Sequence, residues 1–161
     1  MVSLVISGFG TVGQGVAEVL LRRKEFLTGR YGAVPKVVCV MDSKTVAKDP
    51  EGLDLAQVVK RKQETRSVGE ERYTDSLEVL DSVDYDLLIE VTPTDIKTGG
   101  VGLKNITHAF ECGKDVITVN KGPLALEFSR LIGLARTGAN SATKGPSEGP
   151  CPSSTSATRT S

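Results

Sequence analysis

Short apolar runs alternate with amphipathic stretches along most of the chain. Residues 2–6, 36–41, 85–91 and 116–119 are mainly apolar, which is typical of strands buried on both faces of a parallel sheet. After the first run, apolar residues recur at positions 12, 16, 19 and 20, and this spacing predicts a helix that ends near the basic residues 22–24. Two parallel strands joined through a helix require a right-handed crossover. The pattern therefore predicts an α/β fold with a Rossmann-type, doubly wound parallel sheet.

The stretches between the later runs predict further helices. They are expected after Gly52, from the N-cap residue Asp75, over residues 103–112, and from Pro123 to a point before Gly138. Residues 28–35 are interpreted as a polar connection. The charged residues 60–66 are interpreted as a solvated helix face and loop rather than a binding patch.

Composition narrows the class of partner. The 161 residues suit about one domain, and 20 basic and 20 acidic residues give a net charge of zero. This balance argues against nucleic acid or a membrane surface as a partner and favours a small molecule. The three cysteines form no C-x-x-C pair, so no metal site is expected. His108, the one histidine, lies in a predicted helix away from the strand ends and is not expected to be catalytic. With no signal-like or membrane-spanning apolar run, the chain is predicted to be cytoplasmic.

A glycine-rich turn follows the first predicted strand. Its sequence is Gly8, Phe9, Gly10, Thr11, Val12 and Gly13, in the spacing G-x-G-x-x-G. Gly8 allows a tight turn, Gly10 leaves room beside the backbone for a pyrophosphate, and Gly13 lets the next helix pack closely. The helix N-terminus then presents free N–H groups to an anion. The turn predicts a dinucleotide cofactor, with a plain structural turn as the alternative.

The residues after the second predicted strand bear on which dinucleotide binds. Asp42 can accept both ribose hydroxyls of an adenosine, which favours NAD over NADP. Ser43 and Lys44 point the other way, because a hydroxyl and an ammonium can hold a 2′-phosphate. Asp42 can also be an ordinary turn-starting acid. The sequence therefore predicts NADP or NAD without choosing between them.

Two more predicted strands end in polar residues that the sheet should bring to the same edge. Thr92, Pro93 and Thr94 follow the third strand, and Lys121 follows the fourth. Ligands of open α/β sheets bind at the carboxyl ends of the strands, so the threonines can reach a ribose or nicotinamide, and the Lys121 ammonium is expected near the nicotinamide. The alternatives are that Pro93 ends a strand, Thr94 caps the next segment and Lys121 is a surface lysine.

Three separated motifs resemble the cofactor domain of the homoserine dehydrogenase family, particularly its shorter archaeal and bacterial forms. They are G-F-G-T-V-G at residues 8–13, E-V-T-P-T at 90–94 and V-I-T-V-N-K-G-P-L-A at 116–125. The resemblance implies NAD(P)-dependent interconversion of L-homoserine and L-aspartate 4-semialdehyde, in threonine and methionine biosynthesis, by a full-length homodimer. It assigns the turn from Phe9 to Gly13, and Thr92, to the cofactor, and Lys121 to the nicotinamide and substrate.

The resemblance covers residues 1–138, the expected NAD(P)-binding domain, and stops there. Residues 139–161 are rich in Ser, Thr, Pro and Gly and are expected to be a disordered tail. If each codon after Asn140 is read from the third base of the one before, the printed residues permit L-R-Y-E-G-T-V-G-G-A-M-P-V-I-N, which is similar to the family's continuation. A single-base frameshift near Asn140 is therefore expected.

The family's substrate domain and its main catalytic lysine are then missing from this chain, which leaves Lys121 an assisting role at most. A base that accepts the hydroxyl proton is required for alcohol oxidation, so the fragment is predicted to bind cofactor without turnover. Two other functions stay open: the cofactor domain of another small-molecule dehydrogenase, and a non-catalytic NAD(P)-binding module.

Overall fold

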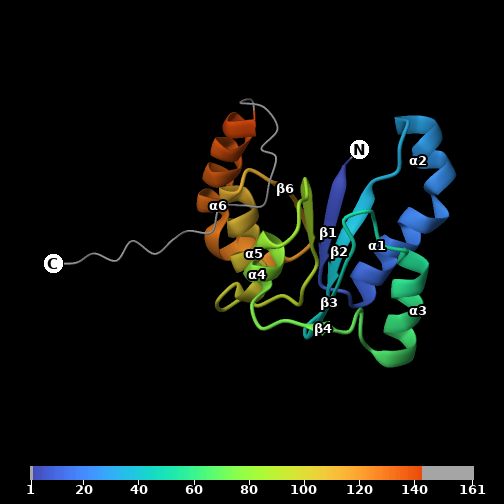
Figure 1. Cartoon of the computed structure of the whole chain (residues 1–161). Helices are drawn as coiled ribbons and strands as arrows, with labels where there is room; N and C mark the ends of the chain where they lie inside the picture. Colours follow the sequence, from blue (N-terminus) through green and yellow to red (C-terminus); the bar gives the residue numbers. More distant parts are fainter. Residues whose placement is uncertain (1, 143–161) are drawn as a thin grey trace.

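The computed structural model describes residues 2–142, which form a six-stranded sheet between two layers of helices (Figure 1). The strand order is β4-β3-β2-β1-β5-β6. Four strands are parallel, and they are β1 (Ser3–Ser7), β2 (Lys36–Met41), β5 (Leu87–Glu90) and β6 (Asp115–Thr118). Two short strands continue the sheet in antiparallel pairing, β3 (Thr45–Lys48) on β2 and β4 (Glu71–Arg72) on β3.

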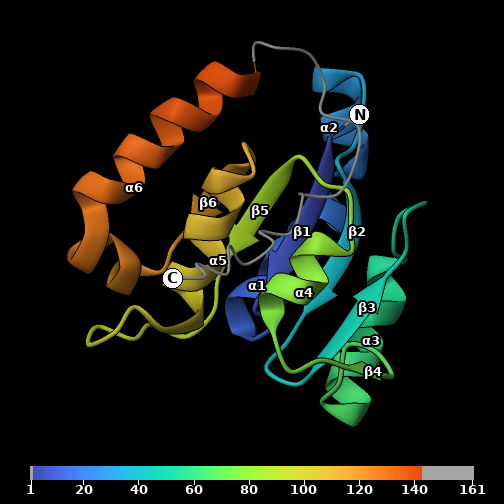
Figure 2. The same ribbon diagram turned by 60° about the vertical axis from the view of Figure 1, so that its left-hand side comes forward.

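The helices divide between the two faces of the sheet, as the doubly wound prediction requires. One layer holds α1 (Thr11–Arg22), α2 (Lys24–Tyr31) and α3 (Leu55–Thr65). The other holds α4 (Ser76–Asp81), α5 (Gly100–Glu111) and α6 (Lys121–Ala142), with α6 packed on α5 (Figure 2). The Rossmann-type architecture predicted from the apolar runs is confirmed.

Several elements differ from the sequence-based expectation. Part of the expected polar connection is the helix α2, which is exposed along most of its length and so has no apolar stripe to reveal it. The strands β3 and β4 were not predicted, and they make the sheet mixed rather than wholly parallel. The last helix does not end before Gly138 but continues to Ala142, with a kink at Glu127. The tail expected to be disordered lies, from residue 143 on, outside the described residues.

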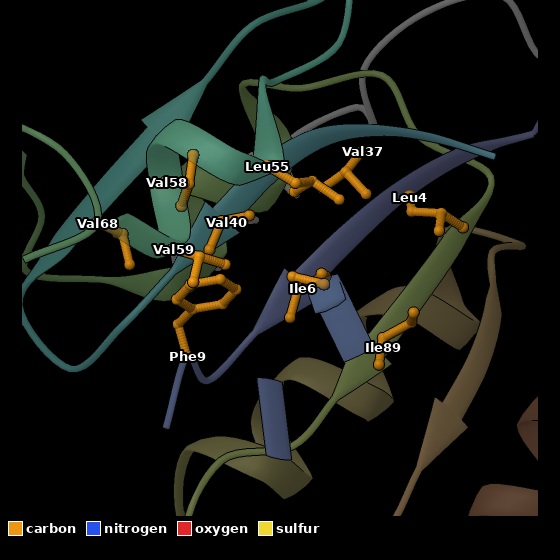
Figure 3. Close-up of a cluster of buried hydrophobic side chains, with 11 residues drawn as sticks. Leu4, Ile6, Phe9, Val37, Val40, Leu55, Val58, Val59, Val68 and Ile89 are labelled. Atoms are coloured by element: carbon orange, nitrogen blue, oxygen red, sulfur yellow. The ribbon is translucent and has the colours of Figure 1, made fainter. Parts of the chain in front are cut away.

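Two apolar clusters fill the space between the sheet and the helix layers. On the side of α1 and α3, Ile6, Phe9, Val40 and Val59 belong to one cluster (Figure 3). Figure 3 shows the Phe9 ring lying beside Val59, and Phe9 is only 1% exposed. The opposite cluster includes Val5, which follows from the alternation of side chains along β1.

The apolar stripe expected on the first helix is only partly correct. Val12 and Val19 are exposed, and the buried residues of α1 are Gly13 and Ala17. The other two residues of the expected stripe, Val16 and Leu20, are partly buried and pack against the core cluster. On α6, Leu131 is buried, whereas other apolar residues of the expected stripe remain exposed, namely Leu124, Phe128 and Ile132.

Asp42 closes the turn between β2 and β3 and ties it to α3. Its Oδ1 accepts hydrogen bonds from the backbone N–H of Lys44 at 2.8 Å and of Thr45 at 2.7 Å, and its Oδ2 accepts one from Lys62 Nζ at 2.7 Å. Burial would raise the pKa of Asp42, but the hydrogen bond from Lys62 and the two backbone bonds outweigh burial, so the pKa lies below its ordinary value. The ionised carboxylate therefore stabilises this corner of the fold.

Among residues 2–142, no helix combines the length and the apolar character that a membrane crossing requires.

We expect Phe9→Ala to lower the free energy of unfolding by about 3–5 kcal/mol, because it removes a buried ring and leaves a cavity. Phe26→Ala is the matched control, since Phe26 is 57% exposed and its loss should change stability by about 0.5 kcal/mol or less. Urea unfolding of both variants measures the difference. Equal effects of the two substitutions would contradict the placement of Phe9 in the core.

We expect Asp42→Asn to lower stability at pH 7 by about 1–3 kcal/mol, because the charged hydrogen bonds are lost. The pKa of Asp42 is lowered on folding, so its stabilising contribution is present above the unfolded pKa of about 4 and disappears as the pH falls through the folded value. The difference in the free energy of unfolding between variant and wild type should therefore disappear below about pH 4. Urea unfolding at several pH values tests this, with Asp84→Asn as control because that side chain is 70% exposed. A gap that stays constant down to pH 3 would refute it.

Candidate functional site

The four parallel strands end at one edge of the sheet, and the residues that follow them form the candidate site. In the register, Ser7 pairs with both Met41 and Glu90, and Glu90 pairs with Thr118. The segments after these positions are therefore neighbours, although they are far apart in sequence. They contain every site residue predicted from the sequence.

The glycine turn after β1 is pressed against the segment after β5. Gly8 has φ +97°, and its N–H donates to the Met41 carbonyl at 2.9 Å. A Cβ on Gly8 would lie 2.7 Å from the backbone of Val91 and Thr92, and a Cβ on Gly13 would lie 2.1 Å from the Gly8 carbonyl oxygen. No side chain fits at either position. The two glycines thus set the distance between the turn, the start of α1 and the end of β5.

Gly10 occupies a different environment. It is exposed, and a Cβ there would meet nothing within 4 Å. It is also the N-cap of α1, with no side chain to bond the first N–H groups, and Thr11 and Val12 beside it are exposed. Open backbone N–H groups at a helix N-terminus favour a bound anion such as a phosphate. Phe9 can take part only through its backbone, because its ring lies in the core.

At the end of β2, the site holds a lysine that the sequence-based interpretation missed. Lys62 of α3 donates to Asp42 Oδ2 at 2.7 Å and to the Arg66 carbonyl at 2.9 Å. Its side chain is 18% exposed, so it does not belong to a solvated face as expected for residues 60–66. Both carboxylate oxygens of Asp42 already accept hydrogen bonds, while Ser43 and Lys44 are exposed. Asp42 and Lys62 together therefore set the charge at the end of β2.

The residues after β5 and β6 lie close together. Asn120 Nδ2 donates to the Thr92 carbonyl at 3.3 Å and to Thr92 Oγ1 at 3.4 Å. Thr92 is half-buried, whereas Pro93, Thr94 and Lys121 are exposed. Lys121 is the first residue of α6, directly after Asn120. The structure therefore brings the backbones of Thr92 and Lys121 together at the ends of the neighbouring strands β5 and β6. Asp42 follows β2, which lies on the other side of β1 in the strand order.

A buried polar network lies beneath this end and was not expected from the sequence. Glu90 is fully buried, and its Oε2 accepts from Asn105 Nδ2 at 3.2 Å. Asn105 also donates to Ser7 Oγ at 3.0 Å and accepts from Ser76 Oγ at 2.6 Å. A carboxylate as the last residue of an otherwise apolar strand is the one sequence signal that could have pointed to it.

His108 lies away from this edge, as expected. Its Nε2 is 2.8 Å from Asp81 Oδ1, so the ring joins α5 to α4. It also lines a cavity of about 460 Å³, together with Thr98, Lys104 and Arg130. Lys104 is paired with Asp75 at 2.8 Å. The cavity lies among the helices of one layer and does not include the glycine turn.

Comparison with known proteins points to one family. A family model described as the NAD-binding domain of homoserine dehydrogenase matches residues 8–142. The homoserine dehydrogenase of Methanocaldococcus jannaschii is 38% identical over 133 residues, which are 80% of this chain and 39% of that protein. An NAD(+)-dependent homoserine dehydrogenase of Pseudomonas canavaninivorans is 29% identical over 138 residues, which cover 83% of this chain and 39% of that protein.

A solved structure with a similar fold also belongs to a homoserine dehydrogenase. The hyperthermophilic archaeal homoserine dehydrogenase in complex with NADPH superposes with a TM-score of 0.70 at 25% identity, covering 85% of this chain and 41% of that one. The chain thus spans about two fifths of the length of the relatives it matches. Because the family model covers most of the chain and the fold agrees, the chain belongs to the homoserine dehydrogenase family, of which it carries the NAD-binding domain.

Proposed function

We propose that this chain is the cofactor-binding part of a homoserine dehydrogenase and binds NADP or NAD across the carboxyl ends of β1, β2, β5 and β6. The observation that carries the proposal is the open N-terminus of α1 at Gly10, at the edge where all four strands end. The pyrophosphate would lie against the backbone from Gly10 to Gly13. The adenosine ribose would lie beside Asp42 and Lys62, and the nicotinamide half near Thr92, Pro93, Thr94 and Lys121.

The geometry of this chain fits such a ligand. Gly10 leaves a cradle that a side chain would fill, and at Gly8 and Gly13 an added Cβ would overlap the backbone. The bound cofactor would supply a hydride acceptor for an alcohol carbon. The Lys121 ammonium, at the same edge, suits an oxygen of a small substrate such as homoserine, in the pathway to threonine and methionine. A cytoplasmic location and a homodimer of the longer protein belong to the same proposal.

Proton transfer requires a base besides the cofactor. In the family that this chain resembles, the main catalytic lysine belongs to the substrate domain, so this chain is proposed to bind cofactor and not to turn over homoserine. The shifted reading frame after Asn140 is part of the proposal, because it supplies the family's continuation. Sequencing the DNA across codon 140 tests it. An intact frame there, with an unrelated sequence in the shifted frame, would refute the frameshift.

Apolar side chains exposed near β6 and α6 support a contact with a further domain or chain at this side of the structure. Ile117 of the edge strand β6 is 53% exposed, Val119 just after the strand is 58% exposed, and Phe128 of α6 is 58% exposed. Several large exposed apolar side chains in one region are typical of a contact with another domain or chain.

The direct test of cofactor binding is a titration of the chain with NADH and NADPH, followed by nicotinamide fluorescence. Saturable binding of either cofactor, without homoserine oxidation, is the expected result. Homoserine oxidation at an ordinary rate would contradict the proposed inactivity, and no binding of any nicotinamide dinucleotide would refute the function itself.

We expect Gly10→Ala to weaken cofactor binding about tenfold or more, because a Cβ would push a phosphate away from N–H groups whose charged hydrogen bonds contribute about 1.5–3 kcal/mol each. Its melting temperature should stay near that of wild type, since the Cβ meets no protein atom within 4 Å. Gly13→Ala should instead lose stability, because its Cβ would lie 2.1 Å from a backbone oxygen. Fluorescence titration and thermal unfolding of both variants separate the two effects. If Gly10→Ala binds as wild type does, the pyrophosphate does not lie there.

We expect Lys62→Met to lower the affinity for NADPH about fivefold or more, on the order of 1 kcal/mol, and the affinity for NADH by less. The reason is that the substitution removes a cation and leaves the Asp42 carboxylate to repel a 2′-phosphate. Lys60→Met is the matched control, because Lys60 is on the same helix with a side chain that is 74% exposed. Equal losses for both cofactors would show that Lys62 does not face the 2′ position.

A further inference from the structure

The carboxylate of Glu90 has surroundings that an ordinary core position does not provide. It is 0% exposed at the end of β5, and none of the ion pairs within the described part of the chain includes it. Burying a carboxylate without a cation is costly unless hydrogen bonds compensate. The protein has therefore built a set of donors around this one side chain, and their arrangement indicates its role.

Those donors come from two directions. From below, Asn105 Nδ2 donates to Oε2 at 3.2 Å. From the site, the Thr92 backbone N–H donates to Oε1 at 2.9 Å, and the Thr92 hydroxyl donates to the same oxygen. All of these neighbours donate, as a carboxylate requires. Glu90 is thus the acceptor that fixes the conformation of Thr92.

The consequence for Thr92 is a fixed hydrogen-bond polarity. A hydroxyl has one proton and two lone pairs, and here the proton is committed to Glu90. Asn120 Nδ2 approaches the oxygen at 3.4 Å as a second donor. What remains on this half-buried hydroxyl is an acceptor lone pair, so it favours a ligand group that donates.

We propose that Glu90 is a positioning residue, which makes the Thr92 hydroxyl an acceptor for an N–H or O–H of the nicotinamide riboside half of the cofactor. The inference rests on the proposed function and adds a residue that does not touch the cofactor. The donor on the ligand is either the carboxamide N–H or a ribose hydroxyl, which share this chemistry.

Glu90→Gln is the central variant, because it keeps the shape and replaces one acceptor oxygen by an NH₂ donor. If that donor faces Thr92, the N–H and O–H of Thr92 lose their acceptor. If it faces Asn105 instead, the acceptor for Thr92 is kept only by setting two NH₂ donors against each other. We expect about fivefold weaker NADH binding, about 1 kcal/mol at this ratio. Thr92→Val should weaken binding similarly, Thr92→Ser should retain it, and the double variant Glu90→Gln with Thr92→Val should bind no more weakly than Thr92→Val alone.

Ser76→Ala is the control for a merely structural role. It removes the hydrogen bond to Asn105 Oδ1 at the far end of the same network and should lower the melting temperature without changing the dissociation constant. Additive losses in the double variant, or a loss in Ser76→Ala as large as in Glu90→Gln, would overturn the inference. If Glu90→Gln does not fold, the comparison of Thr92→Ser with Thr92→Val decides: equal binding by the two overturns it.

A cofactor analogue identifies the donor. The 3-acetylpyridine analogue of NAD replaces the carboxamide NH₂ by a methyl group. If wild type binds NAD more tightly than the analogue and Thr92→Val does not, the carboxamide is the donor. If wild type and Thr92→Val show the same ratio of the two dissociation constants, and Thr92→Val binds both NAD and the analogue more weakly, the donor is a ribose hydroxyl. Failure of wild type to bind any cofactor refutes the proposed function, whereas binding that is indifferent to Glu90 and Thr92 refutes only this inference.

Discussion

The close approach of the β1–α1 turn to the end of β5 is the constraint on which the rest of the site depends. The Gly8 backbone is so near Val91 and Thr92 that a Cβ would overlap them, and Gly13 meets the turn from the other side. This contact brings the open N-terminus of α1 next to the segment that carries Thr92. Without it, the groups that would hold a pyrophosphate and those that would hold a nicotinamide would not share one edge.

Apolar packing and a buried hydrogen-bond network support the two parts of that edge of the sheet. Beneath the turn, the Phe9 ring fills the apolar cluster on the side of α1 and α3, so the turn is anchored by burial. Beneath Thr92, the anchor is polar: Glu90, Asn105 and Ser7 are all buried, and Asn105 donates hydrogen bonds to both of the others. Apolar contacts tolerate small shifts, whereas a buried hydrogen-bond network specifies the positions of its members more closely. The end of the candidate site at Thr92 is therefore more rigidly specified than the glycine turn.

The four parallel strands and the glycine turn were predictable because their signals are local. An uninterrupted apolar run indicates a buried strand, and the G-x-G-x-x-G spacing indicates its turn, without reference to the rest of the chain. The helix α2 and the strand β4 were not, because α2 has no apolar stripe and β4 is two exposed residues defined by pairing with β3. At the site, Lys62 reaches Asp42 across 20 residues, and Asn105 reaches Ser7 across 98. No spacing rule in one sequence indicates such contacts, so the charged run alone predicts Lys62 to be a solvated residue.

The two ends of the site differ in how completely this chain builds them. At the end of β2, Asp42 has a hydrogen-bond partner for each oxygen, and every partner belongs to the chain itself. At the other end, β6 is the edge of the sheet, and the apolar side chains of Ile117 and Val119 are exposed beside Lys121. Exposed apolar edges are unfavourable unless something covers them. If the cofactor binds as proposed, the contacts to its adenosine and pyrophosphate would come from this chain, whereas exclusion of water around the nicotinamide would depend on what covers β6 and α6.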